Sequence, residues 1–339
     1  MTQFNAQTKW GDYTLYSLSN NQNSLIEISD LGAIIVNFWV TTKHCGRQNI
    51  VLGYDQPDEY LAGKAYLGAV VGPWANRIKH GRFTLNGQVF QLECNEGPNH
   101  LHSASANIGN KRWNVEKHSK SQLVLTCHIS KGEAGFPANI TCKVTYTLTN
   151  DNALIISYFA QTDATAPLNL TQHSYFNLSQ QTNILDHTIK INSDSYLHVD
   201  DTSIPIEFRT VENTPMDLRH SQRIGDVIPN DYDQLRTAKG FDHCYVLDGD
   251  IHTSKVKVYS ADTGLQLTVF TDQIGIQFYS GNFLTEEQGR GGQNYNSHAG
   301  LCLETQCFPD QVNMKNADAC IYHPEETYQH SVIYQVTSL

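Results

Sequence analysis

The stretch Ile140-Thr141-Cys142-Lys143-Val144-Thr145-Tyr146-Thr147-Leu148 decides the fold class, because apolar and polar residues alternate through it without a break. Alternation with a period of two places the apolar side chains on one face of a β-strand and the polar side chains on the other. Asn150, Asp151 and Asn152 then favour a turn, and a second apolar run follows from residue 153 to residue 160. The segment therefore predicts two antiparallel neighbours that each bury one face.

The same pattern recurs elsewhere in the chain. Asn86-Gly87 separates two short strand-like runs and favours a two-residue hairpin, because both residues tolerate positive φ. Asp262-Thr263-Gly264 separates another pair, and an apolar alternation from 274 to 278 follows. The clearest helical signal is short, from Asp55 to Gly63. We therefore predict an all-β fold, a large antiparallel β-sandwich with very little helix.

Length and composition narrow the class of protein further. No linker or repeat divides the 339 residues, so one domain spanning residues 1–339 is predicted. The net charge of −11 with scattered basic residues excludes a nucleic-acid partner. The sequence has neither a secretory signal nor a membrane-length apolar run, so no membrane partner is expected. Eight dispersed cysteines are interpreted as reduced thiols of a cytoplasmic protein. The protein is expected to be a monomer or a homodimer.

A carboxylate interrupts the run Gly300-Leu301-Cys302-Leu303-Glu304-Thr305-Gln306, which otherwise has the composition of a buried strand. Ionisable groups rarely occupy core strands without a role. Alternation directs the Glu304 side chain away from the face that carries Leu301 and Leu303, so we expect it to point into a cleft. Glu304 is therefore a candidate general base, and the alternative is a structural glutamate that pairs with an arginine or caps a loop.

Two segments of the first hundred residues offer ligand-binding groups. Asn76 and Arg77 can donate hydrogen bonds to sugar hydroxyls or an anion, or Arg77 can bind backbone carbonyls in a turn. His100 and His102 share a face if their segment is extended, and they would then form half of a metal site with another histidine or acid. No further histidine lies at a diagnostic spacing, so no metal is predicted.

Three later segments add polar groups at strand positions. His173 lies in an alternating run and is expected on its polar face, as a hydrogen-bonding or a catalytic residue. Asp242 precedes an apolar strand, where it either enters a site or caps a turn. Gln277 and Tyr279 alternate with Ile276 and offer an amide and an aromatic plate for the C–H face of a sugar, although Tyr279 could equally pack in the core.

This inventory contains acids, a histidine, an arginine, amides and aromatic rings, without a nucleophile elbow, a phosphate loop or a dinucleotide fingerprint. Such a set suits acid–base chemistry on an uncharged, polyhydroxylated substrate, with no cofactor.

Six segments together resemble the aldose 1-epimerase family, whose members are also called galactose mutarotases. The segments are Ala75-Asn76-Arg77-Ile78, Asn99-His100-Leu101-His102, His173-Ser174-Tyr175-Phe176-Asn177-Leu178, Gly240-Phe241-Asp242-His243, Gln277-Phe278-Tyr279-Ser280-Gly281-Asn282 and Leu303-Glu304-Thr305-Gln306. Their order and spacing match the family from about residue 10 to the end. The chain departs from the family at Gly72-Pro73, where Gly-Arg is common, and at Ser103-Ala104, where glycines are common.

The resemblance implies a sandwich with an open sugar-binding cleft and an isomerase that interconverts the α and β anomers of galactose, glucose and related aldoses. It implies that Glu304 is the general base and His173 the general acid. The substrate-binding residues that it implies are Asn76, Arg77, His100, Asp242 and Gln277.

The implied mechanism leads to further expectations. Glu304 and His173 should face each other across a pyranose, Asp242 should raise the pKa of His173, and the activity should have a bell-shaped pH dependence. Three alternatives stay open: a non-catalytic sugar-binding module, a glycoside hydrolase that uses Glu304 with Asp242, and a hexose-phosphate epimerase in which Arg77 holds the phosphate.

Overall fold

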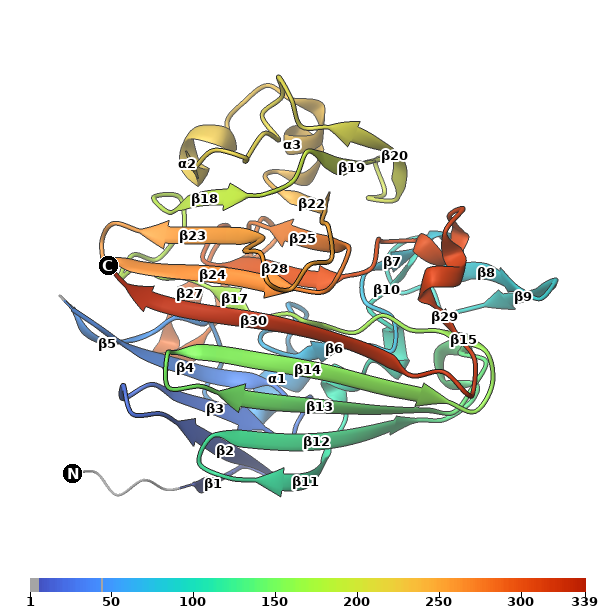
Figure 1. The fold of residues 1–339 in the computed structure, drawn as a ribbon, viewed down its shortest axis with the longest axis horizontal. Coiled ribbons are helices and arrows are strands. Elements are labelled where there is room, and N and C mark those ends of the chain that lie inside the picture. The colour runs from blue at the N-terminus through green and yellow to red at the C-terminus, as the bar shows by residue number, and fades with distance from the viewer. Residues whose placement is uncertain (1–5, 44) are drawn as a thin grey trace.

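The computed structural model describes residues 6–43 and 45–339, and antiparallel strands are its main regular structure (Figure 1). The largest sheet has nine strands. In spatial order they are β11 (Asn114–His118), β12 (Gln122–Ile129), β13 (Ile140–Leu148), β14 (Ala153–Thr162), β30 (Tyr328–Ser338), β24 (Leu265–Thr271), β23 (Val256–Ser260), β18 (Thr188–Ile191) and β21 (Gln222–Arg223).

Two smaller sheets complete the main architecture. The six-stranded sheet has the order β17 (Tyr175–Phe176), β28 (Leu301–Gln306), β25 (Gly275–Tyr279), β22 (Asp242–Val246), β19 (Ser195–Val199) and β20 (Pro205–Thr210). The five-stranded sheet has the order β1 (Gln7–Trp10), β2 (Tyr13–Ser19), β3 (Leu25–Ser29), β4 (Ile35–Thr42) and β5 (Gly46–Asn49). The described residues also form five separate two-stranded sheets: β6 (Val70–Val71) with β16 (Thr171–Gln172), β7 (Arg77–Ile78) with β10 (His100–Leu101), β8 (Arg82–Leu85) with β9 (Gln88–Gln91), β15 (Ala166–Pro167) with β29 (Ile321–Tyr322), and β26 (Glu287–Gln288) with β27 (Asn294–Tyr295).

The main hydrophobic core lies between the nine-stranded sheet and the two smaller sheets. It draws buried side chains from all three sheets, among them Val144 of β13, Phe38 of β4 and Leu303 of β28. Tyr334 of β30 crosses this core, since its hydroxyl donates a hydrogen bond to the carbonyl of Leu303 at 2.9 Å. Burial of apolar side chains from facing sheets stabilises a sandwich. The predicted all-β, antiparallel β-sandwich is therefore confirmed.

The predicted hairpins form. β13 pairs with β14 around the turn at 149–152, and alternate residues of β13 are buried and half-buried as the sequence pattern requires. Leu85 pairs with Gln88 across Asn86-Gly87, and β23 pairs with β24 across the 262–264 turn. The alternation from 274 to 278 becomes β25, which belongs to the six-stranded sheet and not to the sheet that contains β24.

Helix is sparse, as predicted. α1 (Pro57–Ala62) begins after Gln56 and ends at Gly63, within the expected segment. The sequence analysis did not identify α2 (Ile224–Val227) and α3 (Asp233–Ala238), which are short and lie in one connection between strands. In the described residues, no helix has the length and apolar character required to span a bilayer.

β28 positions the candidate site. It pairs with β17 on one side and with β25 on the other, and all six of its residues are buried. Its register places Glu304 directly opposite Gln277 of β25, and the next strand, β22, begins at Asp242. Three of the predicted site residues therefore lie on three strands that are neighbours in one sheet.

Candidate active site

A cavity of about 190 Å³ opens over the six-stranded sheet, next to the β7–β10 pair. Six of the eight residues predicted from the sequence line it: Asn76, Arg77, His173, Asp242, Tyr279 and Glu304. The remaining lining residues are Lys64, Tyr66, Glu96, Leu101, His102, Tyr175 and Phe283. Most of the polar groups selected from separate segments therefore meet in one place.

Glu304 and His173 form the centre of this cavity. Nε2 of His173 lies 3.8 Å from Oε1 of Glu304, and only 6% and 3% of the two side chains are exposed. Among the described residues, Oε2 of Glu304 has no hydrogen-bond partner. Because an unpaired buried carboxylate oxygen is costly, this atom favours a ligand hydroxyl. The short separation corrects the expectation that the pair encloses a pyranose, since no ring fits between the two groups.

Burial favours the uncharged forms of both His173 and Glu304. It lowers the pKa of His173 to about 4. It also raises the pKa of Glu304 well above its ordinary value, with a further increase from Asp242 and a partial offset from Arg77. The expected increase in the pKa of His173 by Asp242 is therefore wrong, because the charge of Asp242 acts on Glu304. Both shifts favour a neutral imidazole and a protonated carboxyl over the ion pair.

Arg77 is held by two carboxylates and not by backbone carbonyls. Its Nε and one terminal nitrogen donate to the two carboxylate oxygens of Glu96 at 2.6 and 2.7 Å. Another terminal nitrogen lies 3.9 Å from Oδ2 of Asp242. Burial lowers the pKa of Arg77, but Asp242 and Glu96 more than offset that effect, so the guanidinium stays charged.

Gln277 lies beside the cavity without lining it. Its Nε2 donates to Oδ1 of Asp242 at 2.7 Å, while its Oε1 has no partner in the described part of the chain. The amide fixes one oxygen of Asp242 and leaves the other toward Arg77. Gln277 and Asp242 therefore form a hydrogen-bonded pair on adjacent strands, immediately next to Glu304.

The structure separates His100 from the other predicted residues. The premise that His100 and His102 share a face requires an extended chain, but β10 ends at Leu101 and His102 has a φ of 49°. The ring of His100 turns toward Phe136, and its Nδ1 lies 2.7 Å from the carbonyl oxygen of Glu93. His100 does not line the cavity and His102 does, so the prediction placed the wrong histidine of this motif in it.

His102 has a defined tautomer. Its Nδ1 accepts the backbone N–H of Asn76 at 3.0 Å, so the neutral ring carries its proton on Nε2. Burial, together with His173 and Arg77, lowers the pKa of His102 well below its usual range. The ring is thus a neutral hydrogen-bond donor beside His173, with ring centroids 5.3 Å apart.

His102, His173 and Glu304 offer three ligand atoms within 4.8 Å of one another, a spacing that could hold a metal ion. A metal needs an imidazole nitrogen with a free lone pair. The hydrogen bond from Asn76 occupies that lone pair on Nδ1 of His102 and leaves the proton on Nε2. The donor set therefore suits hydrogen bonding to a hydroxylated ligand better than coordination.

Aromatic rings form the walls of the cavity. The ring of His173 lies between Tyr66 and Tyr175, at centroid distances of 5.7 and 5.2 Å. Tyr279 packs edge-on against Tyr175 and stacks with the exposed Phe283 at the cavity mouth. The sequence analysis selected only Tyr279. Tyr66 and Glu96 carry no local signal, because their contribution depends on loops that only tertiary structure brings together.

Ser103 and Ala104, which depart from the glycines common in the family, keep left-handed backbone conformations with φ of 66° and 46°. Ser103 compensates through its hydroxyl, which accepts the backbone N–H of Trp74 at 2.8 Å and donates to the carbonyl of Trp74 at 2.9 Å. The residue that replaces glycine thus joins the loop that carries His102 to the segment that carries Asn76 and Arg77.

Comparison with known proteins identifies the family of the chain. The model of the family described as aldose 1-epimerase matches residues 14–335. The chain is 35% identical to aldose 1-epimerase of Escherichia coli K12 over 329 residues, which cover 95% of each chain. It is 38% identical to galactose mutarotase of Mus musculus over 336 residues, 96% of this chain and 94% of the mouse protein.

Solved structures of aldose epimerases resemble the fold of this chain. The aldose epimerase homologue from C. elegans superposes with a TM-score of 0.90 at 26% identity, covering 96% of this chain and 99% of that one. Galactose 1-epimerase from Lactobacillus acidophilus superposes with a TM-score of 0.86 at 25% identity, covering 98% and 97%. With the family model and close relatives matching almost the whole length, this chain belongs to the aldose 1-epimerase family of isomerases.

Proposed function

We propose that this protein interconverts the α and β anomers of free aldohexoses, such as galactose and glucose, with Glu304 and His173 as its catalytic pair. The observation that carries the assignment is the contact of these two buried groups, 3.8 Å apart, in a cavity lined by hydrogen-bonding residues. Both reacting oxygens of an aldopyranose, the anomeric hydroxyl and the ring oxygen, are bonded to C1. Two catalytic groups therefore need to reach neighbouring atoms and need not enclose the ring.

Ring opening requires two proton transfers. With the shared proton on His173, the Glu304 carboxylate takes the proton of the anomeric hydroxyl while the imidazolium gives its proton to the ring oxygen. The C1–O5 bond breaks and a C1 aldehyde forms. Arg77 favours the ionised form of Glu304, because its positive charge opposes the effect of burial on that pKa.

Rotation about the C1–C2 bond then presents the other face of the aldehyde to the C5 hydroxyl. His173 takes the proton of that hydroxyl, Glu304 returns its proton to the carbonyl oxygen, and the ring closes as the opposite anomer. Both groups recover their starting protonation. Asn76, Asp242 and His102 hold hydroxyls that do not react, so that the open chain rotates without leaving. Gln277 positions Asp242.

The charges of the cavity favour an unphosphorylated sugar. Two donors of Arg77 are already occupied by Glu96, and Asp242 lies beside its third nitrogen. A phosphate at this position would meet two carboxylates and a guanidinium with few free donors. These contacts argue against the hexose-phosphate alternative. The hydrolase alternative leaves His173 without a task, and the binding-module alternative leaves the buried acid and histidine without one.

The cellular setting is part of the proposal. All eight cysteines are free thiols in the structure, which supports a reducing compartment and hence the cytoplasm. We propose that residues 1–339 act as one catalytic domain, as a monomer or a homodimer.

Polarimetry tests the activity directly. Crystalline α-D-galactose or α-D-glucose is dissolved, and the optical rotation is followed with and without the protein. The protein should accelerate the approach to the anomeric equilibrium without changing its end point. Rates equal to those in buffer for both sugars would overturn the proposed activity.

A further inference from the structure

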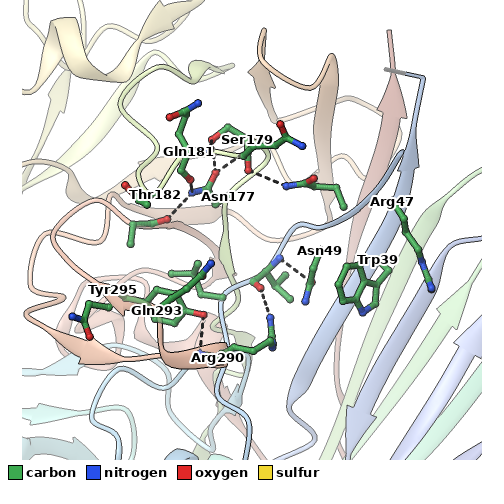
Figure 2. Close-up of a pocket in the computed structure, with 17 residues that line it drawn as sticks. Trp39, Arg47, Asn49, Asn177, Ser179, Gln181, Thr182, Arg290, Gln293 and Tyr295 are labelled. Atoms are coloured by element: carbon green, nitrogen blue, oxygen red, sulfur yellow. Dashed lines mark hydrogen bonds between the residues drawn. The ribbon is translucent and has the colours of Figure 1, made fainter. Parts of the chain in front are cut away.

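A second and larger cavity lies outside the catalytic site. Its volume is about 560 Å³, and Figure 2 shows the side chains that line it. They come from β4 and β5, from the segment 177–182 that follows β17, and from residues 290–299 before β28. It shares no lining residue with the catalytic cavity.

The charge of this cavity differs from that of the whole chain. The chain has a net charge of −11, yet the described residues of the lining include Arg47 and Arg290 and no aspartate or glutamate. Two carboxylates lie just outside the lining, and each accepts a backbone N–H at 2.7 Å: Asp55 from Gly291 and Asp262 from Gln180. Other arginines, such as Arg219 and Arg223, pair with carboxylates. The cavity therefore favours an anion.

Arg47 and Trp39 form one wall. The guanidinium carbon of Arg47 lies 5.4 Å from the centroid of the Trp39 ring, and the two side chains are adjacent in Figure 2. Trp39 is half-buried, whereas Trp10, Trp74 and Trp113 are buried. An aromatic ring packs against the C–H face of a sugar, and a guanidinium donates hydrogen bonds to phosphate oxygens. A ligand that contacts one of these groups also meets the other.

The opposite wall is rich in amides and hydroxyls. Exposed side chains from two segments line it: Gln180, Gln181, Thr182, Gln293 and Asn294. Each amide both donates and accepts hydrogen bonds, which matches vicinal sugar hydroxyls. A purely apolar ligand would leave these groups without partners. A metal ion would find no carboxylate ligand in the lining.

A hydrogen-bonded frame holds the two walls in place. Asn177 donates from Nδ2 to the carbonyls of Gln181 and Ala299 at 3.0 and 2.9 Å. Arg290 donates to the carbonyl oxygens of Val36 and Val51 at 2.5 and 3.4 Å. These bonds tie the segments 177–182 and 290–299 to each other and to β4. The cavity is thus built by folded backbone before any ligand arrives.

We infer that this cavity is a second carbohydrate site, which binds a phosphorylated sugar with the ring against Trp39 and the phosphate at Arg47. This ligand differs in charge from the neutral aldose proposed for the catalytic site, so the two sites select different molecules. The inference does not depend on the catalytic proposal, because it uses none of the same residues.

Tryptophan fluorescence provides the test. Wild-type protein is titrated with D-glucose 6-phosphate with and without excess galactose, and parallel titrations use galactose alone and inorganic phosphate. We expect a saturable change with the sugar phosphate, weakened by added salt. Arg47→Ala should weaken binding about tenfold or more, because a charge-assisted contact is lost. Trp39→Phe should remove the fluorescence signal while calorimetry still detects binding.

The control is Arg82→Ala, which removes another exposed arginine, from β8. It should leave the affinity within twofold of wild type, and polarimetry on Arg47→Ala should give an unchanged mutarotation rate. Four results would overturn the inference. They are no saturation up to about 10 mM sugar phosphate, equal affinity in Arg47→Ala and wild type, full competition by galactose, and inorganic phosphate binding as tightly as the sugar phosphate.

Discussion

Nε2 of His173 and Oε1 of Glu304 lie 3.8 Å apart, on two segments that are separated by 130 residues in the chain and joined by strand pairing in the fold. Burial opposes charge on both groups, so the state with one proton between them is favoured over states with none or two. An acid and a base that share a proton can exchange roles without help from solvent. This exchange of roles suits a reaction whose forward and reverse directions are chemically alike.

Glu304→Gln should retain the fold and sugar binding but lose about 10²- to 10⁴-fold in turnover, because the amide cannot accept the proton of the anomeric hydroxyl. Polarimetry gives the rate, and calorimetry with galactose gives the affinity. Glu116→Gln, on the outer strand β11, is the control and should have wild-type turnover. Near-normal activity of Glu304→Gln would remove this residue from the mechanism.

The same substitution should stabilise the protein at neutral pH. The pKa of Glu304 is raised in the folded state above its ordinary value of 4.5, so below that value both states are protonated and nothing is lost. As the pH rises further, the unfolded state ionises first, and wild type loses up to about 1.4 kcal/mol of stability per pH unit. Urea unfolding should show Glu304→Gln more stable than wild type at pH 7.5, with the difference vanishing near pH 4.5. A difference independent of pH would contradict the raised pKa.

His173 should remain neutral in the free protein until the pH falls to about 4. Below that pH a second proton enters the pair, so Glu304 can no longer act as a base and the activity falls. On the alkaline side the activity falls when the last proton leaves at the raised pKa of Glu304. The ring nitrogens of His173 can be titrated by NMR, alongside the pH profile of kcat/KM. Titration of His173 near pH 6.5 would be inconsistent with the effect of burial.

The two histidines of the His-Leu-His motif should differ in their roles. His102→Asn retains an acceptor for the backbone N–H of Asn76 but removes the Nε2 donor, so kcat/KM should fall about 10- to 100-fold with little loss of stability. His100→Asn should lower the melting temperature, because that ring is buried against Phe136, while its kcat/KM stays near that of wild type. The reverse result would restore His100 to the site.

Ala104→Gly should stabilise the fold by up to about 1 kcal/mol, because Ala104 has a φ of 46° in the left-handed region that glycine adopts without strain. Ala106→Gly in the same short 3₁₀-helix is the matched control. Ala106 is buried and has no positive φ, so that variant should be destabilised. Urea unfolding measures both.

Much of the architecture could be predicted because strand signals are local. The alternation in β13, the turn at Asn86-Gly87 and the acid within β28 each reveal their role within about ten residues. The assignment of β25 to a different sheet from β24 could not be predicted, since pairing depends on contacts between distant segments.

The site residues likewise divide into those whose positions could be predicted from the sequence and those whose positions could not. Strand positions placed Asp242 and Glu304 correctly, because a strand fixes the direction of its side chains. The choice between His100 and His102 failed, because a run of positive φ that begins at His102 ends the extended conformation. The short distance between His173 and Glu304 and the partnership of Arg77 with Glu96 likewise arise only from tertiary packing.

β30 lies in the middle of the nine-stranded sheet, between β14 and β24, although it is the last strand of the chain (Figure 1). During synthesis the strands on both sides of β30 emerge before it, so each half of that sheet keeps an open edge until β30 is available. Pairing over so long a stretch of chain is slow, and unpaired edges invite association between nascent molecules. β30 thus closes the sandwich, and its emergence sets the moment at which the strands that carry Asp242 and Glu304 gain their permanent support.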